Sequence, residues 1–171
     1  MFRMILLVAS LAIASTCNAQ SVPDGTLVFS NKKGIVGRVA RRITGGDRYT
    51  HVGIVFDGYV YESDWPRSKR TPVQSYGKPG STNDYYAPST PIDRDRLAAM
   101  RSQANATLGT PYRLRGYFRP GVTSAGTWCS PYVGRILAAG GSSLSNHDRH
   151  EPQNLLRRVG GDHRLSSRVR R

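Results

Sequence analysis

The chain has very few cysteines and no long hydrophobic run. Its 171 residues include only two cysteines, Cys17 and Cys129. The longest apolar run, MILLVASLAIA, lies near the start and is too short to cross a hydrocarbon core of roughly 30 Å. The sequence therefore excludes a scaffold held by several disulfides, and we expect no transmembrane segment in the mature chain.

The first 19 residues have the pattern of a removable secretory signal. Arg3 precedes the apolar run, and small residues lead to Cys17-Asn18-Ala19. We therefore expect residues 1–19 to be a signal peptide and the mature protein to be periplasmic or secreted. A lipoprotein signal that ends at Cys17 is the alternative, but Ala14, Ser15 and Thr16 match such a signal poorly. Removal of the signal leaves Cys129 as the single thiol.

Acidic residues are also scarce. The chain has 11 Asp and Glu against 25 Lys and Arg, with a formal net charge of +14. A basic exported protein is attracted to anionic surfaces such as cell-wall polymers, phospholipid head groups or nucleic acid. No nucleic-acid-binding motif accompanies the charge, so we expect no specific nucleic-acid partner.

The remaining length suits one domain, over residues 20–160, followed by a basic C-terminal tail at 161–171. The local patterns predict a strand at 25–30, helices at 32–48, 91–109 and 130–141, and an irregular segment at 64–91 with one short strand at most. Ser130 is the expected N-cap of the last of these helices. The mixture predicts an α+β fold.

The stretch THVGIVFDGYVYES, residues 50–63, predicts a β-hairpin because Asp57-Gly58 suits a two-residue turn. This turn fixes a register that places His51, Glu62 and Asp64 on one face, with Asp64 directly opposite His51 and Glu62 diagonal to it. An acid there can hold one imidazole nitrogen and leave the other to act as a base. A solvated surface pair is the ordinary alternative.

Cys129 lies at the start of a predicted helix, where the helix dipole lowers a thiol pKa and favours the nucleophilic thiolate. A buried structural thiol is the ordinary alternative. Together with the hairpin, Cys129 predicts a Cys–His–acid hydrolase or acyltransferase. Cys129 would attack a carbonyl, His51 would act as base and then as acid, and Glu62 would orient His51. Pairing geometry alone favours Asp64 for that last role.

Five segments between residues 24 and 156 resemble the NlpC-type cell-wall amidase superfamily, in its circularly permuted papain-like branch (YiiX-like). They are DGTLVFS, THVGIVFDGYVYES, ATLGTPYRLRGYF, TWCSPYVGRIL and EPQNLL. His51 precedes Cys129, which is the permuted order. The resemblance implies a permuted papain-like fold, in which a small antiparallel sheet or partial barrel packs against helices.

The resemblance also implies roles for individual residues. Cys129 would be the nucleophile, His51 the base and Glu62 the third polar group, and Tyr112 would lie near the substrate. We place Asp64 with Tyr112 among the substrate-binding residues. The chain departs from the family pattern at two places. Asp24-Gly25 stands where Gly-Asp is usual, and Arg113 stands where an acidic residue is common.

We therefore expect an exported cysteine hydrolase that cleaves amide bonds, with peptidoglycan stem peptides as its substrate and no metal or organic cofactor. A lipid acyl hydrolase or acyltransferase would use the same three residues. A non-catalytic cationic binding or effector protein is the alternative from another class. His147 and His150, with acids nearby, could bind a metal, but a polar surface loop is the simpler interpretation.

Overall fold

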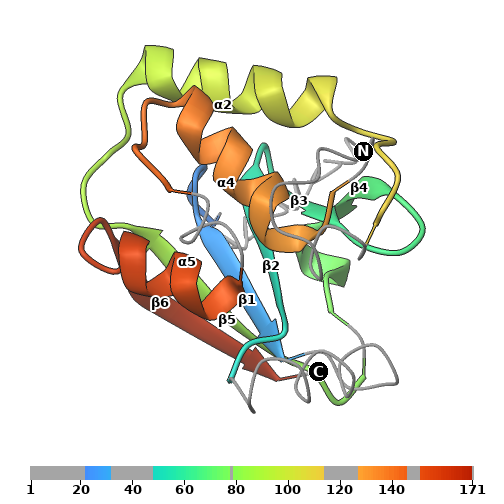
Figure 1. Cartoon of the computed structure of the whole chain (residues 1–171). Helices are drawn as coiled ribbons and strands as arrows, with labels where there is room; N and C mark the ends of the chain where they lie inside the picture. Colours follow the sequence, from blue (N-terminus) through green and yellow to red (C-terminus); the bar gives the residue numbers. More distant parts are fainter. Residues whose placement is uncertain (1–21, 32–47, 78, 114–126, 146–150, 171) are drawn as a thin grey trace, which may run out of the picture.

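The computed structural model describes residues 22–31, 48–77, 79–113, 127–145 and 151–170. These residues form one antiparallel sheet with helices packed against it (Figure 1). The strands are β1 (Leu27–Asn31), β2 (His51–Phe56), β3 (Tyr59–Ser63), β4 (Ser68–Pro72), β5 (Thr82–Pro88) and β6 (His163–Arg170). The helices are η1 (Val73–Ser75), α2 (Arg94–Ala106), α4 (Cys129–Ala139) and α5 (Pro152–Val159). The architecture is α+β, as the sequence predicts.

The sheet is open and has the strand order β4-β3-β2-β1-β5-β6. Each neighbouring pair of strands is antiparallel. The strands β1 and β2 lie in the middle, where both of their edges are hydrogen-bonded, and nearly all of their side chains are buried. The hairpin predicted from the sequence is therefore part of a larger sheet.

Alternation along the strands creates an apolar layer on each face of the sheet. On β1, Leu27 and Phe29 face the helices, whereas Val28 faces the other side. The larger layer takes its helical part from Met100, Ala104, Tyr132, Val133, Ile136, Leu137, Leu155 and Val159. The smaller layer consists of Val28, Val55, Val60, Tyr76 and Tyr85.

The helix α4 lies between α2 and the strands β2 and β3. Seven of its 11 residues are buried. Just after its end, a Cβ atom on Gly140 would lie 2.6 Å from the Met100 sulfur, so a side chain at this close crossing of α2 would require Met100 to shift. Packing along the whole helix fixes the position of its first residue, Cys129.

The predicted hairpin is confirmed. Asp57 and Gly58 have φ angles of 51° and 74°, as the two central positions of a type I′ turn require. The register runs from this turn to Gly53 opposite Glu62. The carboxylate of Asp24 accepts a hydrogen bond from the Asp57 N–H at 2.8 Å, which gives this acid a structural role at the turn.

Several local predictions are wrong in their details. The segment 64–91 contains two strands, β4 and β5, as well as the short helix η1. The helix predicted at 130–141 begins at Cys129, and Trp128 is its N-cap in place of Ser130. The helix predicted at 91–109 covers only Arg94–Ala106, because Asp93 caps its first turn.

Three predictions fall on residues that the structure does not describe. They concern the signal peptide at 1–19, the helix at 32–48 and the loop that holds His147 and His150. Among the described residues, no helix has both the length and the apolar character needed to cross a membrane.

The predicted basic tail at 161–171 contains the edge strand β6, which pairs with β5 along its whole length. Arg168 anchors it, because its guanidinium donates to both carboxylate oxygens of Asp84, at 2.6 and 2.9 Å. Asp84 is completely buried and also accepts hydrogen bonds from Arg48 and Tyr49. An interaction across the sheet therefore orders a segment that, by composition alone, resembles a solvated tail.

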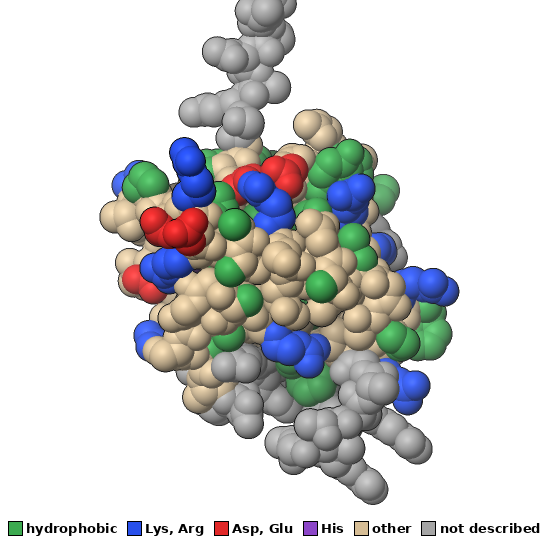
Figure 2. Space-filling view, turned by 90° about the horizontal axis from the view of Figure 1, so that it is seen from above, with side chains coloured by type: hydrophobic (Ala, Val, Ile, Leu, Met, Phe, Trp, Pro, Cys, Tyr) green, Lys and Arg blue, Asp and Glu red, His purple; other side chains and the backbone are tan. Residues whose placement is uncertain are grey.

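Basic side chains are scattered over the surface above α2. Figure 2 shows this face, on which Lys and Arg lie apart from one another and Asp and Glu lie among them. The net positive charge is therefore not gathered into one patch on this side of the molecule.

Removal of the buried carboxylate should destabilise the fold. We expect Asp84→Ala to lower the free energy of unfolding by about 2–4 kcal/mol, because it removes the acceptor shared by Arg48, Tyr49 and Arg168 and leaves β6 without its anchor. Arg164→Ala, at an exposed position of the same strand, should change it by less than about 0.5 kcal/mol. Urea unfolding measures both values, and equal effects of the two substitutions would contradict the anchoring role of Asp84.

Candidate active site

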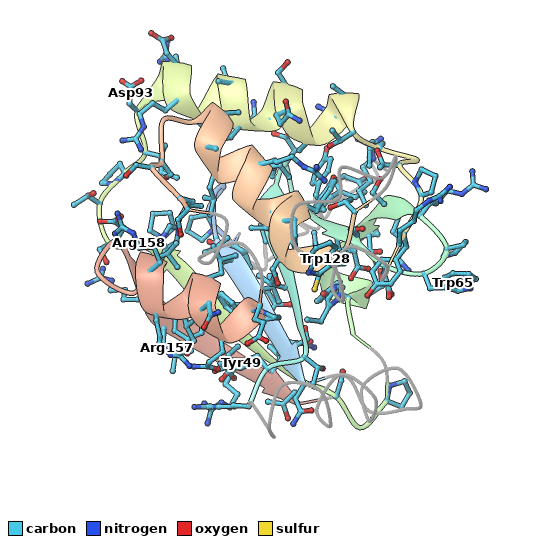
Figure 3. The ribbon with its side chains drawn as sticks, in the orientation of Figure 1. Tyr49, Trp65, Asp93, Trp128, Arg157 and Arg158 are labelled. Atoms are coloured by element: carbon cyan, nitrogen blue, oxygen red, sulfur yellow. The ribbon has the colours of Figure 1, made fainter. Side chains whose placement is uncertain are left out.

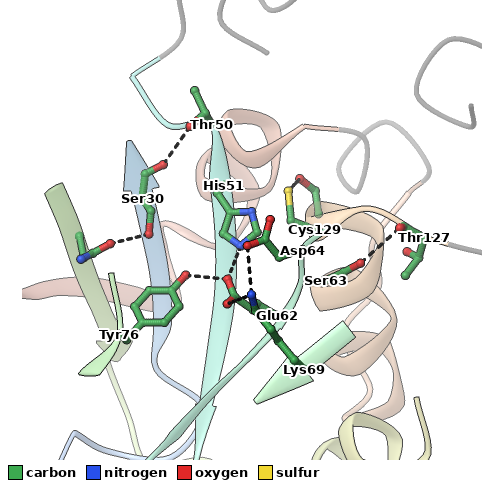
Figure 4. Close-up of polar contacts among 12 residues, drawn as sticks. Ser30, Thr50, His51, Glu62, Ser63, Asp64, Lys69, Tyr76, Thr127 and Cys129 are labelled. Carbon is green, nitrogen blue, oxygen red and sulfur yellow. Dashed lines mark hydrogen bonds and ion pairs between the residues drawn. The ribbon is translucent and has the colours of Figure 1, made fainter. Parts of the chain in front are cut away.

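Three elements meet where β2 begins. His51 is the first residue of β2, Glu62 belongs to β3, and Cys129 is the first residue of α4. Figure 3 labels Trp128, the residue before Cys129, at the start of α4. The three side chains come together in Figure 4, and each is at least nine-tenths buried.

The acid that holds His51 is Glu62. His51 Nε2 lies 2.7 Å from Glu62 Oε2. The partner of Glu62 in the register is Gly53, which has no side chain between the two groups. A Cβ atom on Gly53 would come within 2.6 Å of a Val60 methyl group, so a side chain there would disturb both strands. Glu62, which is diagonal to His51 in the register, thus reaches the imidazole past a residue that has no side chain.

Asp64 lies beyond the end of β3, and its carboxylate is 3.3 Å from Lys69 Nζ. The β2–β3 ladder does not extend to the predicted direct pair between Asp64 and His51. The β2–β3 pairing ends at Gly53 and Glu62, and Ser63 instead donates its hydroxyl to the carbonyl of Thr127. The chain leaves the ladder before Asp64 can occupy the paired position.

Two further residues fix the carboxylate of Glu62. The Tyr76 hydroxyl donates to Oε2 at 3.2 Å, and Lys69 Nζ lies 3.7 Å from Oε1. Burial raises the pKa of Tyr76 well above its ordinary value, and the charge of Glu62 raises it further, so the phenol stays protonated as a donor. Two donors in addition to His51 therefore surround the carboxylate of Glu62.

Cys129 lies where its thiolate is stabilised. Burial by itself raises the pKa of the thiol, but the charge of His51 and hydrogen bonds from His51, Ser130 and the Val52 backbone outweigh that effect and lower the pKa. Because Glu62 binds Nε2, the other nitrogen of His51, Nδ1, is the one left to serve Cys129. The helix dipole of α4 acts in the same direction.

The start of α4 also suits the binding of an oxyanion. No side chain caps the first turn of the helix, since Trp128 forms no capping hydrogen bond. The backbone N–H groups of a helix start carry partial positive charge and can stabilise a negative oxygen that develops beside them. The thiol and these donors belong to the same turn.

The resemblance places Tyr112 near the substrate, and the structure brings it close to Cys129. Burial raises the pKa of Tyr112, and the negative charges of Cys129 and Asp64 raise it further. The Tyr112 N–H donates to the carbonyl of Pro66 at 2.9 Å, and Tyr112 pairs with Thr127, two residues before the thiol. Tyr112 is thus a neighbour of the thiol, and Asp64 lies near Tyr112.

Lys69 and Tyr76 are site residues that the sequence patterns do not identify. Lys69 lies on β4 directly opposite Glu62, and Tyr76 follows η1. Both belong to the segment whose composition predicts irregular structure. The pairing of β4 with β3 is the signal that identifies Lys69, because it places a lysine directly opposite Glu62 on the neighbouring strand.

The chain matches no protein-family model and no curated protein. Among solved structures, it is similar to the crystal structure of the metalloprotein yiiX from Escherichia coli O157:H7, with a TM-score of 0.58 and 21% sequence identity. The alignment covers 87% of this chain and 88% of that chain. At this level of identity, the similarity shows the fold alone.

The solved structure of yiiX is described as a metalloprotein, which raises the question of whether side chains of this chain could bind a metal ion. In the described residues, no group of three or more His, Cys, Asp and Glu side chains could hold a metal ion. In the candidate site, His51 Nε2 is already bonded to Glu62. The described residues therefore do not fit a metal centre.

The pH dependence of thiol alkylation tests the environment of Cys129. In a Cys17→Ser background, the rate should reach half of its maximum below the ordinary pKa of a free thiol. His51→Ala should move this midpoint above the ordinary value, because burial remains while the positive partner is lost. An unchanged midpoint in His51→Ala would contradict the contact between these two residues.

Substitution of the two acids should shift the pKa of the Cys129 thiol in opposite directions. Glu62→Gln should raise the midpoint of alkylation, because the positive form of His51 loses its partner. Asp64→Asn should lower it slightly, because a negative charge near Tyr112, itself a neighbour of the thiol, is removed. Stopped-flow alkylation of both variants measures the shifts, and the reverse pattern would make Asp64 the acid that holds His51.

Proposed function

We propose that this protein is a cysteine hydrolase with Cys129 as nucleophile, His51 as base and acid, and Glu62 as the residue that orients His51. The observation that carries the proposal is the buried 2.7 Å contact between His51 and Glu62, beside a thiol at a helix start. A Cys–His–acid set of this kind is what covalent acyl transfer requires.

In the first step, the sulfur of Cys129 attacks the carbonyl carbon and forms a C–S bond. The backbone N–H groups at the start of α4 stabilise the oxygen that becomes negative. His51 then donates a proton to the leaving nitrogen, the C–N bond breaks, and a thioester on Cys129 remains.

In the second step, His51 removes a proton from water, and the resulting hydroxide attacks the thioester. The C–S bond breaks, the acid product leaves, and the thiolate is restored beside the protonated imidazole. Glu62 does not exchange a proton in either step. It keeps Nε2 engaged, so that Nδ1 faces the reacting groups in both steps.

We propose amide bonds in peptides as the substrate class, with peptidoglycan stem peptides as the natural example. This assignment extends the resemblance to the NlpC-type superfamily and its permuted papain-like branch, and the fold shared with yiiX supports it. It also places the protein in the periplasm or outside the cell. Arg113, where the family commonly has an acid, would favour substrates with a negative group near the scissile bond.

A lipid acyl hydrolase or acyltransferase is the second candidate. The observation that favours it is Trp65, which is 71% exposed one residue beyond Asp64. A binding protein without catalysis is less favoured, because it has no use for a buried His–Glu contact next to a thiol.

Activity against two substrates separates these proposals. The full chain should release new amino groups from purified stem peptides, and Cys129→Ala should lower the rate by at least about a thousandfold. Ser63→Ala, which removes a hydroxyl that bonds the backbone of Thr127, is a matched control that should keep most of the activity. Fatty acid release from phospholipid without peptide cleavage would favour the lipid candidate, and an active Cys129→Ala would exclude both.

A further inference from the structure

A single large aromatic side chain projects from the loop that joins β3 to β4. Trp65 is 71% exposed, more than either of the other exposed large hydrophobic residues described, Leu108 and Leu165. Figure 3 shows it pointing outward at the edge of the molecule, on the opposite side from Arg157 and Arg158. A single exposed indole is ordinary on a protein surface, so the role of Trp65 depends on what lies beside it.

The loop that carries Trp65 is held firmly in place. The carbonyl of Pro66 accepts the Tyr112 N–H at 2.9 Å, and the Ser68 N–H donates to the Thr110 carbonyl at 2.8 Å. The Ser68 hydroxyl also donates to the carbonyl of Thr107. The fold thus presents the indole at a fixed place.

Two cations accompany the indole on the same pair of segments. Arg67 pairs with Pro111 in an antiparallel bridge, and continuing this register places Arg113 opposite Trp65. Arg67 and Arg113 are exposed, and neither forms an ion pair within the described part of the chain. We name this surface the Trp65 rim, and it consists of Trp65, Pro66, Arg67, Pro111 and Arg113.

We propose that the Trp65 rim docks the protein on a lipid bilayer that contains anionic phospholipids. Tryptophan prefers the boundary between water and lipid, and arginines near it are attracted to anionic head groups. An anionic cell-wall polymer would satisfy the two arginines but offers no apolar region for the indole. A bilayer surface provides both.

The Trp65 rim is next to the candidate site. Asp64 precedes Trp65 directly, and Tyr112 lies between Pro111 and Arg113. Tyr112 is an electrostatic neighbour of both Cys129 and Asp64. Docking would therefore hold Asp64 and Tyr112, which lie beside the candidate site, close to the membrane surface. This inference goes beyond the proposed reaction, because binding to lipid does not require the thiol.

Vesicle sedimentation tests the inference. The full chain with Cys129→Ala, which prevents acyl transfer, is mixed with vesicles of phosphatidylcholine alone or with added phosphatidylglycerol. We expect binding to the anionic vesicles only, a roughly tenfold loss of binding for Trp65→Ala, and retention of most binding for Trp65→Phe. Trp65 is exposed, and circular dichroism checks that each variant, including the buried Cys129→Ala background, is folded.

A charge-matched pair of double variants completes the design. Arg67→Gln with Arg113→Gln should weaken vesicle binding strongly, whereas Arg94→Gln with Arg157→Gln, at exposed positions of α2 and α5, should weaken it little. Equal losses would show that net charge alone causes binding and would overturn the proposal. Full binding by Trp65→Ala, or binding to purified cell-wall sacculi but not to vesicles, would also overturn it.

Discussion

The contact between His51 and Glu62 is the interaction on which the site depends. It joins the first residue of β2 to β3 at 2.7 Å, in a place from which water is nearly excluded. Burial of two ionisable groups is costly unless each is paired and hydrogen-bonded. The structure meets this condition with Tyr76, which donates to the same oxygen Oε2 that contacts His51, and with Lys69, whose Nζ lies 3.7 Å from Oε1. These contacts hold Glu62 in the position from which it orients His51.

The packing of the rest of the fold places the thiol of Cys129 beside His51 and Glu62. The helix α4 is packed between the sheet and α2, so its first residue cannot move far from the start of β2. The same sheet extends through β1 and β5 to β6, where the buried Asp84 holds Arg168. The edge strand β6, whose sequence shows no strand pattern, is thus part of the same sheet as the central strands that carry the site. The fold relative yiiX has the same overall architecture at low sequence identity, so the chemistry must be argued from the residues present here.

The sequence predicts the parts of the structure whose causes are local. Asp57-Gly58 defines its turn by backbone preference, and α4 is predicted to within two residues at each end because its apolar stripe is strong. It does not predict β4, β5 or β6, because their pairing partners are distant and their residues are largely polar. The choice between Glu62 and Asp64 depends on where β3 leaves the ladder, which no local pattern specifies. Tyr76 and Lys69 were missed for the same reason, since both reach Glu62 through tertiary structure.

The central claim is that Glu62 acts on Cys129 only through His51. A double-mutant cycle on the thiol pKa tests this claim directly, with His51→Ala, Glu62→Gln and the double variant in a Cys17→Ser background. The account predicts that Glu62→Gln raises the pKa when His51 is present and does not raise it when His51 is absent. An equal rise in both backgrounds would show that Glu62 acts on the thiol independently, and the proposed unit of three residues would be wrong.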